Sequence, residues 1–164
     1  MAGGMSAPQS LPVERVGDYI ATFIPHQNDF VRLDRRFVIP KTTWAKLPQY
    51  KDYGFVVFQL IGHLGEATTP HPMALQFGTR DPKALFFPTI HIHDGQVHTR
   101  ERFDHVLYAQ ATGVIESPFI RSQKTAATTV NTAQTEGIVL ADSPVLRNAL
   151  YGVRPNQDRV VRLL

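Results

Sequence analysis

The amino-acid sequence predicts an antiparallel β fold, either all-β or β with one or two short helices, arranged as a sandwich or barrel of about eight short strands. Short apolar segments rich in Val, Ile, Phe and Tyr recur along the chain and are separated by Gly and Pro turns. Long amphipathic segments, which would connect parallel strands as helices, are absent between them. These two observations favour an antiparallel fold over a doubly wound α/β fold.

The length and composition indicate one folded domain. The chain has 164 residues, of which 43% are hydrophobic and 10% aromatic, so it can bury a substantial core. Residues 1–12 are rich in Gly, Ala, Ser and Pro, and we expect them to form a flexible leader. Residues 13–164 are then expected to form a single β-rich domain.

The elements are predicted from hydrophobic pattern and from the position of Pro and Gly. Tyr19–Ile24 is predicted as the first strand, and the apolar run Gly54–Ile61 as a central strand buried on both faces. Lys41–Leu47 is predicted as one or two helical turns that end before Pro48. Further strands are predicted at Arg36–Ile39, Met73–Phe77, Leu85–His93 and Phe103–Gln110, a helix or ordered loop at Ser122–Glu136, and a terminal hairpin of Val145–Gly152 and Arg159–Leu163.

The composition also excludes several classes of function. The chain has no cysteine, which excludes disulfides, thiolate metal sites and cysteine nucleophiles. Its net charge is +3, but the basic residues are dispersed rather than arranged as a stripe on one element, which argues against nucleic-acid binding. It lacks a signal-peptide pattern and an apolar run of the ~20 residues that span a bilayer, so we expect a cytoplasmic protein with no membrane partner.

The most informative segment is a predicted hairpin that carries histidines, residues 86–110. Asp94-Gly95 is a strong signal for a two-residue hairpin turn, because that turn needs a positive φ at both positions. With these two residues in the turn, His91 lies opposite His98. Opposed residues share a face of the sheet, as do residues two apart on one strand. The register therefore predicts His91, His93 and His98 on one face.

Three imidazoles on one face predict a metal site. Two from one strand and one from its neighbour can reach a common ion at ~2.0–2.1 Å each. Nitrogen and carboxylate ligands suit Zn, Fe, Ni or Cu, and the sequence does not choose among these ions. The candidate ligands are His91, His93 and His98, with His105 or His71 as a fourth, and Glu101 and Asp104 are candidates for a supporting carboxylate or a general base.

Two other interpretations of the hairpin remain open. A hairpin on a protein surface also has one apolar and one polar face, with histidine as an ordinary solvated residue. The histidines also suit a metal-free role in acid–base catalysis or pH sensing. The sequence carries no Gly-x-Ser-x-Gly elbow, phosphate-binding loop or dinucleotide fingerprint. We therefore expect a non-catalytic binding or assembly module, with a protein partner or a second copy of itself, and the alternative is a small metalloprotein that could be an enzyme.

Overall fold

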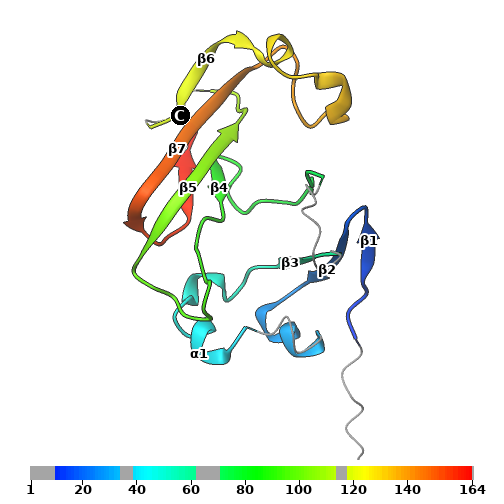
Figure 1. Cartoon of the computed structure of the whole chain (residues 1–164), viewed down its shortest axis with the longest axis vertical. Helices are drawn as coiled ribbons and strands as arrows, with labels where there is room; N and C mark the ends of the chain where they lie inside the picture. The colour runs from blue at the N-terminus through cyan, green and yellow to red at the C-terminus, as the bar shows by residue number, and fades with distance from the viewer. Residues whose placement is uncertain (1–9, 34–38, 62–70, 114–117, 164) are drawn as a thin grey trace, which may run out of the picture. The chain divides into compact units, whose positions relative to one another are not determined.

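A computed structural model describes residues 10–33, 39–61, 71–113 and 118–163. The chain divides into two compact units, Met1–Gln76 and Phe77–Leu164, and each is described separately below. The described residues form eight strands in three antiparallel sheets, one short α-helix and several 3-10 turns (Figure 1). The prediction of an antiparallel β chain with little helix is confirmed. None of the helices in these residues is long and apolar enough to cross a membrane.

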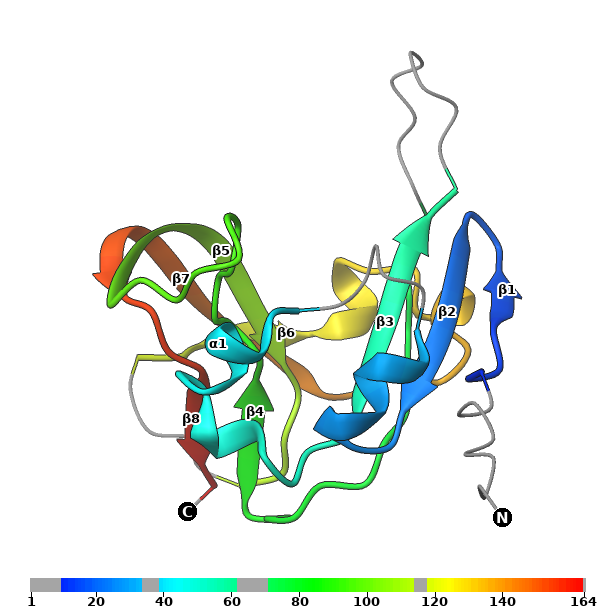
Figure 2. The same ribbon diagram turned by 90° about the horizontal axis from the view of Figure 1, so that it is seen from below.

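The first unit contains a three-stranded sheet of β1 (Glu14–Val16), β2 (Tyr19–Ile24) and β3 (Phe55–Leu60). β2 lies in the middle, as Figure 2 shows. The predicted first strand is confirmed with both of its ends. The predicted strand over Gly54–Ile61 is also present as β3, but its expected central position is wrong, because β3 is an edge strand of this sheet and its side chains are half-buried or exposed.

An aromatic cluster packs against one face of this sheet. Ile24 is fully buried, and Phe30 is buried beside it. The rings of Phe30, Trp44 and Phe55 lie 5.0 to 5.3 Å apart in tilted and edge-on arrangements, the geometry that aromatic pairs prefer. Leu11, which falls within the segment expected to be a leader, is buried in the same core.

Short helical turns bring these aromatic residues to the sheet. A 3-10 helix, Gln27–Arg32, presents Phe30, and α1 (Lys41–Trp44) presents Trp44. The predicted helical turns over Lys41–Leu47 are therefore confirmed: Pro40 is the N-cap of α1, and Ala45 and Lys46 continue as a turn before Pro48. The predicted strand at residues 36–39 lies almost entirely outside the described residues.

The second unit contains two sheets. β4 (Ala84–Phe87) pairs with β8 (Arg159–Arg162), and β7 (Pro144–Pro155) lies between β5 (Arg100–Ala109) and β6 (Ile120–Thr125), as seen in Figure 1. Both strands of the predicted terminal hairpin exist, but the hairpin does not form. β7 pairs with β5 and β6, and β8 pairs with β4 instead.

Three further segments differ from the sequence predictions. Met73–Phe77 is not a strand: none of the described strands pairs with it, and the side chains of Leu75 and Phe77 are exposed. The strand predicted over Leu85–His93 ends at Phe87, immediately before a proline that cannot donate a hydrogen bond. Ser122–Glu136 begins as the end of β6 and continues as two 3-10 turns, which fits its low hydrophobicity and its many threonines.

Candidate functional site

The histidine-bearing segment is a loop between β4 and β5, and the predicted hairpin register is wrong. Residues 88–99 form no strand, so His91 and His98 are not a cross-strand pair. Gly95 has a positive φ of 75°, but Asp94 does not. The Asp94 carboxylate instead accepts a hydrogen bond from the backbone N–H of Gln96 at 2.9 Å. This bond is typical of a turn built on an Asp side chain, which needs no positive φ at the Asp itself.

Asp158, which follows β7, holds the first part of this loop. Its Oδ1 atom accepts hydrogen bonds from the backbone N–H groups of Thr89 at 2.9 Å and Ile90 at 3.3 Å. The Thr89 hydroxyl donates to the carbonyl of Gln157 at 2.8 Å. The N–H groups that a hairpin would have used are therefore satisfied by a side chain from a distant part of the sequence.

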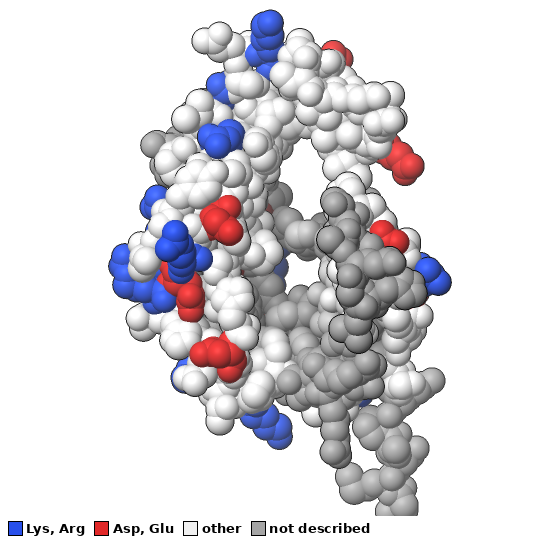
Figure 3. Space-filling model, viewed as in Figure 1, with Lys and Arg blue, Asp and Glu red and all other residues white. Residues whose placement is uncertain are grey.

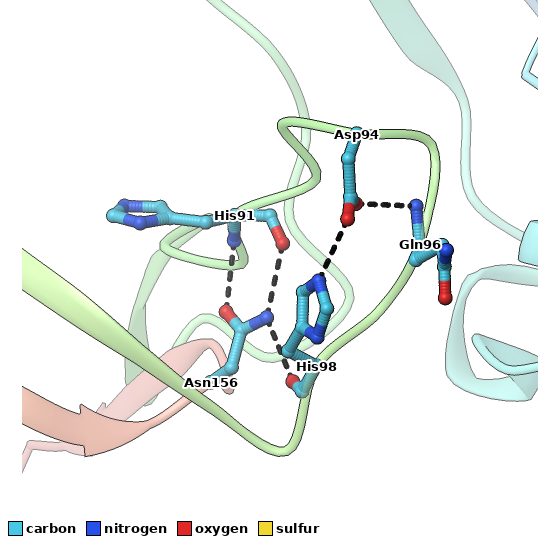
Figure 4. Close-up of polar contacts among 5 residues, drawn as sticks. All are labelled: His91, Asp94, Gln96, His98 and Asn156. Carbon is cyan, nitrogen blue, oxygen red and sulfur yellow. Dashed lines mark hydrogen bonds and ion pairs between the residues drawn. The ribbon is translucent and has the colours of Figure 1, made fainter.

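Asn156 continues this attachment and closes the loop at its base (Figure 4). Its Oδ1 atom accepts from the His91 N–H at 2.8 Å, and its Nδ2 atom donates to the carbonyls of His91 at 2.9 Å and His98 at 3.0 Å. The backbone N–H of Asn156 also donates to the carbonyl of Thr99 at 3.0 Å. One amide side chain thus fixes both ends of the segment between His91 and His98.

His98 is engaged within the loop itself. Its Nε2 atom lies 2.9 Å from Oδ2 of Asp94, and Figure 4 shows its ring turned toward Asp94 while the His91 ring points away. The hydrogen bond from His98, followed by that from the Gln96 N–H, lowers the pKa of the Asp94 carboxyl. His98 therefore stabilises the turn and lies outside the group of imidazoles around His91.

The structure brings a different group of imidazoles together. The His91 ring stacks on Phe103 of β5 with centroids 4.6 Å apart, and the His93 ring lies 5.1 Å from it edge-on. The Nε2 atoms of His91 and His105 are 2.8 Å apart. Phe103 and His105 are two residues apart on β5, so they share a face of the sheet and together receive the His91 ring.

A hydrogen-bonded chain runs from Asp104 through His105 to His91. The Nδ1 atom of His105 lies 2.9 Å from Oδ1 of Asp104, so this nitrogen carries a proton and donates it to the carboxylate. When His105 is neutral, its Nε2 atom is an acceptor, and the bond at 2.8 Å requires the Nε2–H of His91 as donor. The Nδ1 atom of His91 then carries a lone pair.

That Nδ1 atom of His91 is buried and has no hydrogen-bond partner among the described residues. Desolvation lowers the pKa of His91 below 6.5, and the nearby His105 and His93 imidazoles lower it further. The carboxylates of Glu101 and Asp104 act in the opposite direction but do not outweigh these effects. His91 is thus held as a neutral imidazole, and its Nδ1 atom is shielded from water.

The predicted site residues are therefore only partly assembled. His91, His93 and His105 are neighbours, and Asp104 supports His105, whereas His98 bonds to Asp94. Within the part of the chain that the structure describes, no three His, Asp or Glu side chains are grouped so as to hold a metal ion. The assignment of metal ligands remains a prediction.

His71, the other predicted fourth ligand, belongs to the first unit and holds a turn there. Its Nε2 atom accepts from the backbone N–H of Asp18 at 3.0 Å, and its Nδ1 atom donates to the carbonyl of Pro72 at 2.9 Å. Gly17 has a φ of 57°, and a Cβ atom at this position would overlap the His71 ring. Both ring nitrogens are therefore in use, as expected for a histidine that orients a turn.

Sequence reasoning missed Asn156 and Asp158 as residues that build the site. The predicted terminal hairpin of Val145–Gly152 and Arg159–Leu163 places both of them in the connection between its strands. The available signal was their chemistry, because Asn and Asp in a turn commonly accept backbone N–H groups. Nothing in the sequence shows that the accepted groups lie more than sixty residues away.

We expect Asn156→Ala to release the loop of residues 88–99. The substitution removes the side-chain amide, whose oxygen and nitrogen together make three hydrogen bonds to the loop. It should lower the free energy of unfolding by about 1–3 kcal/mol. Hydrogen exchange should show faster exchange of the His91 amide. Asn156→Asp retains the acceptor, so it should keep that amide protected. Equal exchange in the wild type and Asn156→Ala would contradict this role.

We expect His91 to titrate below 6.5 in the metal-free protein, as measured by NMR of its imidazole Cε1–H resonance in the presence of a chelator. The folded state then binds fewer protons than the unfolded state just below pH 6.5. The free energy of unfolding should be constant above this pH and fall as the pH is lowered toward the folded pKa. His91→Gln should reduce this dependence, and a His91 titration at or above 6.5 would contradict the expectation.

Comparison with known proteins supplies no template for this arrangement. No protein-family model, no curated protein and no solved structure matches the chain.

Proposed function

We propose that the protein is a non-catalytic assembly module that associates with a second copy of itself through the first unit. The observation that carries this proposal is an exposed apolar face on the sheet β1–β2–β3, here called the apolar face. The strand register places these residues on it: Glu14, Val16, Tyr19, Ala21, Phe23, Val56, Phe58 and Leu60.

The apolar face is the side of the sheet opposite the aromatic core. Ile24 and Phe55 point to the core side, so their neighbours along each strand point to the other side. Phe23 is 58% exposed there, and Val16 and Leu60 are each 43% exposed. A contiguous apolar surface of this kind is typical of an interaction site, because its burial is favourable in water.

The charge of this face and the position of β3 favour a second copy as the partner. Glu14, at the β1 side, is the one charged residue among those that the register places on the face, so two copies would not repel each other. The edge strand β3 contributes Val56, Phe58 and Leu60 to the face, and its segment Phe55–Leu60 carries no charge. Packing of two such sheets face to face would bury both apolar faces between the copies.

Self-association is tested by the mass of the purified protein across concentration, measured by light scattering after gel filtration. We expect the wild type to form a dimer and Phe23→Glu to remain a monomer at the same concentration. Val31→Glu is the matched control, because Val31 is 64% exposed in the same unit but lies outside the sheet. A wild type that remains monomeric at 100 µM, or equal loss of the dimer in both variants, would contradict the proposal.

A second function, metal binding, is supported by the 2.8 Å separation of the His91 and His105 Nε2 atoms. Two nitrogens this close can both contact one ion at ~2.0–2.1 Å. The Asp104 carboxylate accepts a hydrogen bond from Nδ1 of His105, the ring nitrogen that does not face His91. Carboxylates commonly hold the second nitrogen of a metal-bound imidazole in this way. His93 is the nearest third ligand, although its ring would have to turn toward the pair. We propose Zn, Fe, Ni or Cu as the candidate ions.

Elemental analysis of protein purified without a histidine tag tests this second function. We expect one equivalent of a transition metal in the wild type and in His98→Ala, since His98 bonds to Asp94 rather than to the pair. His91→Ala and His105→Ala should lose most of it, with the fold checked by circular dichroism. Metal content that does not change with either of these two substitutions would exclude the site.

A further inference from the structure

The sheet β5–β7–β6 has an exposed face that differs in chemistry from the apolar face of the first unit. Phe103, Leu146 and Leu150 are each 3% exposed and lie on its buried side. The residues between these positions along each strand point to the opposite side of the sheet, here called the tyrosine face. Its residues are Arg100, Arg102, Asp104, Val106 and Tyr108 on β5, Arg147, Ala149, Tyr151, Val153 and Pro155 on β7, and Ile120 on β6.

Two tyrosines stand exposed on this face. Tyr108 is 61% exposed and Tyr151 is 54% exposed. Tyr151 is the cross-strand partner of Asp104, which precedes Tyr108 by four residues on β5. At ~3.4 Å per residue, the two rings are offset by ~14 Å along the strands. They can therefore contact different parts of one extended ligand.

Arginines accompany both tyrosines. Tyr108 is directly opposite Arg147, and Arg102 lies on the row next to Tyr151. Neither Arg102 nor Arg147 makes an ion pair with another described residue. Arg100 donates to the carbonyl of Val153 at 3.1 Å.

The tyrosine face carries a net positive charge. Three arginines lie on it against one acidic residue, Asp104, which also accepts from His105. Figure 3 shows Lys and Arg side chains over the part of the surface that contains β5 and β7, with acidic groups among them. The positive charge is therefore presented as separate guanidinium groups beside exposed rings rather than as a continuous basic patch.

We propose that the tyrosine face binds single-stranded nucleic acid without strong sequence preference. Exposed aromatic rings stack on unpaired bases, and separate cationic groups contact the phosphates between them. A planar, anionic and extended ligand matches both features of the face, whereas an apolar protein surface would offer the guanidinium groups of Arg102 and Arg147 no negative charge. Stacking tolerates any base, because every base presents an aromatic face to the ring.

The sequence pattern alone could not show this surface. Arg102 and Arg147 are separated by forty-five positions and become neighbours of the same face only through the pairing of β5 with β7. The two tyrosines belong to the same two strands, and alternation by itself does not say which side of a strand is covered. A search for basic residues on one element therefore misses them.

Fluorescence anisotropy with a labelled 12-nucleotide single strand, as DNA and as RNA, tests the proposal. We expect micromolar binding at low salt that weakens as salt is raised, because phosphate contacts release counterions. Tyr108→Ala and Tyr151→Ala should each weaken binding about ten-fold, within the range for loss of one stacked base. Arg102→Gln and Arg147→Gln should each reduce the salt dependence by about one unit of slope.

Two variants and one ligand serve as controls. Phe77→Ala removes an aromatic side chain that is 61% exposed outside the sheet, and Lys51→Gln removes a positive charge from the first unit. Both should bind as the wild type does, and a DNA duplex, whose bases are not free to stack, should bind more weakly. No binding at 100 µM would overturn the proposal. Binding that depends on the arginines but not on the tyrosines would also overturn it, because it would show attraction to any polyanion.

Discussion

The attachment of residues 89–98 to the two side chains after β7 determines the arrangement of the second unit's loop. Asn156 and Asp158 satisfy five backbone groups of this segment, which would otherwise lack hydrogen bonds once β4 ends at Phe87. Burial of backbone groups without partners is costly, so the loop adopts the path that these side chains allow. That path directs the His91 ring onto β5.

The chemistry of the histidines follows from this path. His91 rests on Phe103 and shares a hydrogen bond with His105, whose other nitrogen bonds to Asp104. This hydrogen-bonded chain links the exposed carboxylate of Asp104, through His105, to the imidazole of His91, whose Nδ1 atom is buried. The same geometry explains why the pKa of His91 is lowered, since a proton added there would be desolvated and placed close to a second imidazole.

The two three-stranded sheets use the same construction with different outer surfaces. One face of each sheet is buried, and it carries Ile24 in the first unit and Leu150 in the second. The exposed face of the first is almost uncharged, whereas that of the second combines Tyr151 with arginines. Burial alone does not distinguish the two outer faces, but the chemistry of their side chains favours different partners for each.

Local signals in the sequence are enough to predict the class of the fold and the position of several elements. β2, over Tyr19–Ile24, and the helical turns that begin at Lys41 follow from local composition, Pro and β-branched residues, and these signals act within a few residues. His91 was a candidate through a hairpin register that does not form, and His105 through its residue type and its place near that segment.

The pairing of segments and the contacts between distant side chains follow instead from the folded chain as a whole. Asp94-Gly95 forms a turn, but the Asp94 side chain bonds to Gln96 and His98, and the strands of a hairpin do not follow. His91 meets His105 because Asn156, which is sixty-five residues from His91, holds its backbone. Such contacts depend on strand pairing across long sequence separations, and local patterns carry no information about which partner a strand or a loop will find.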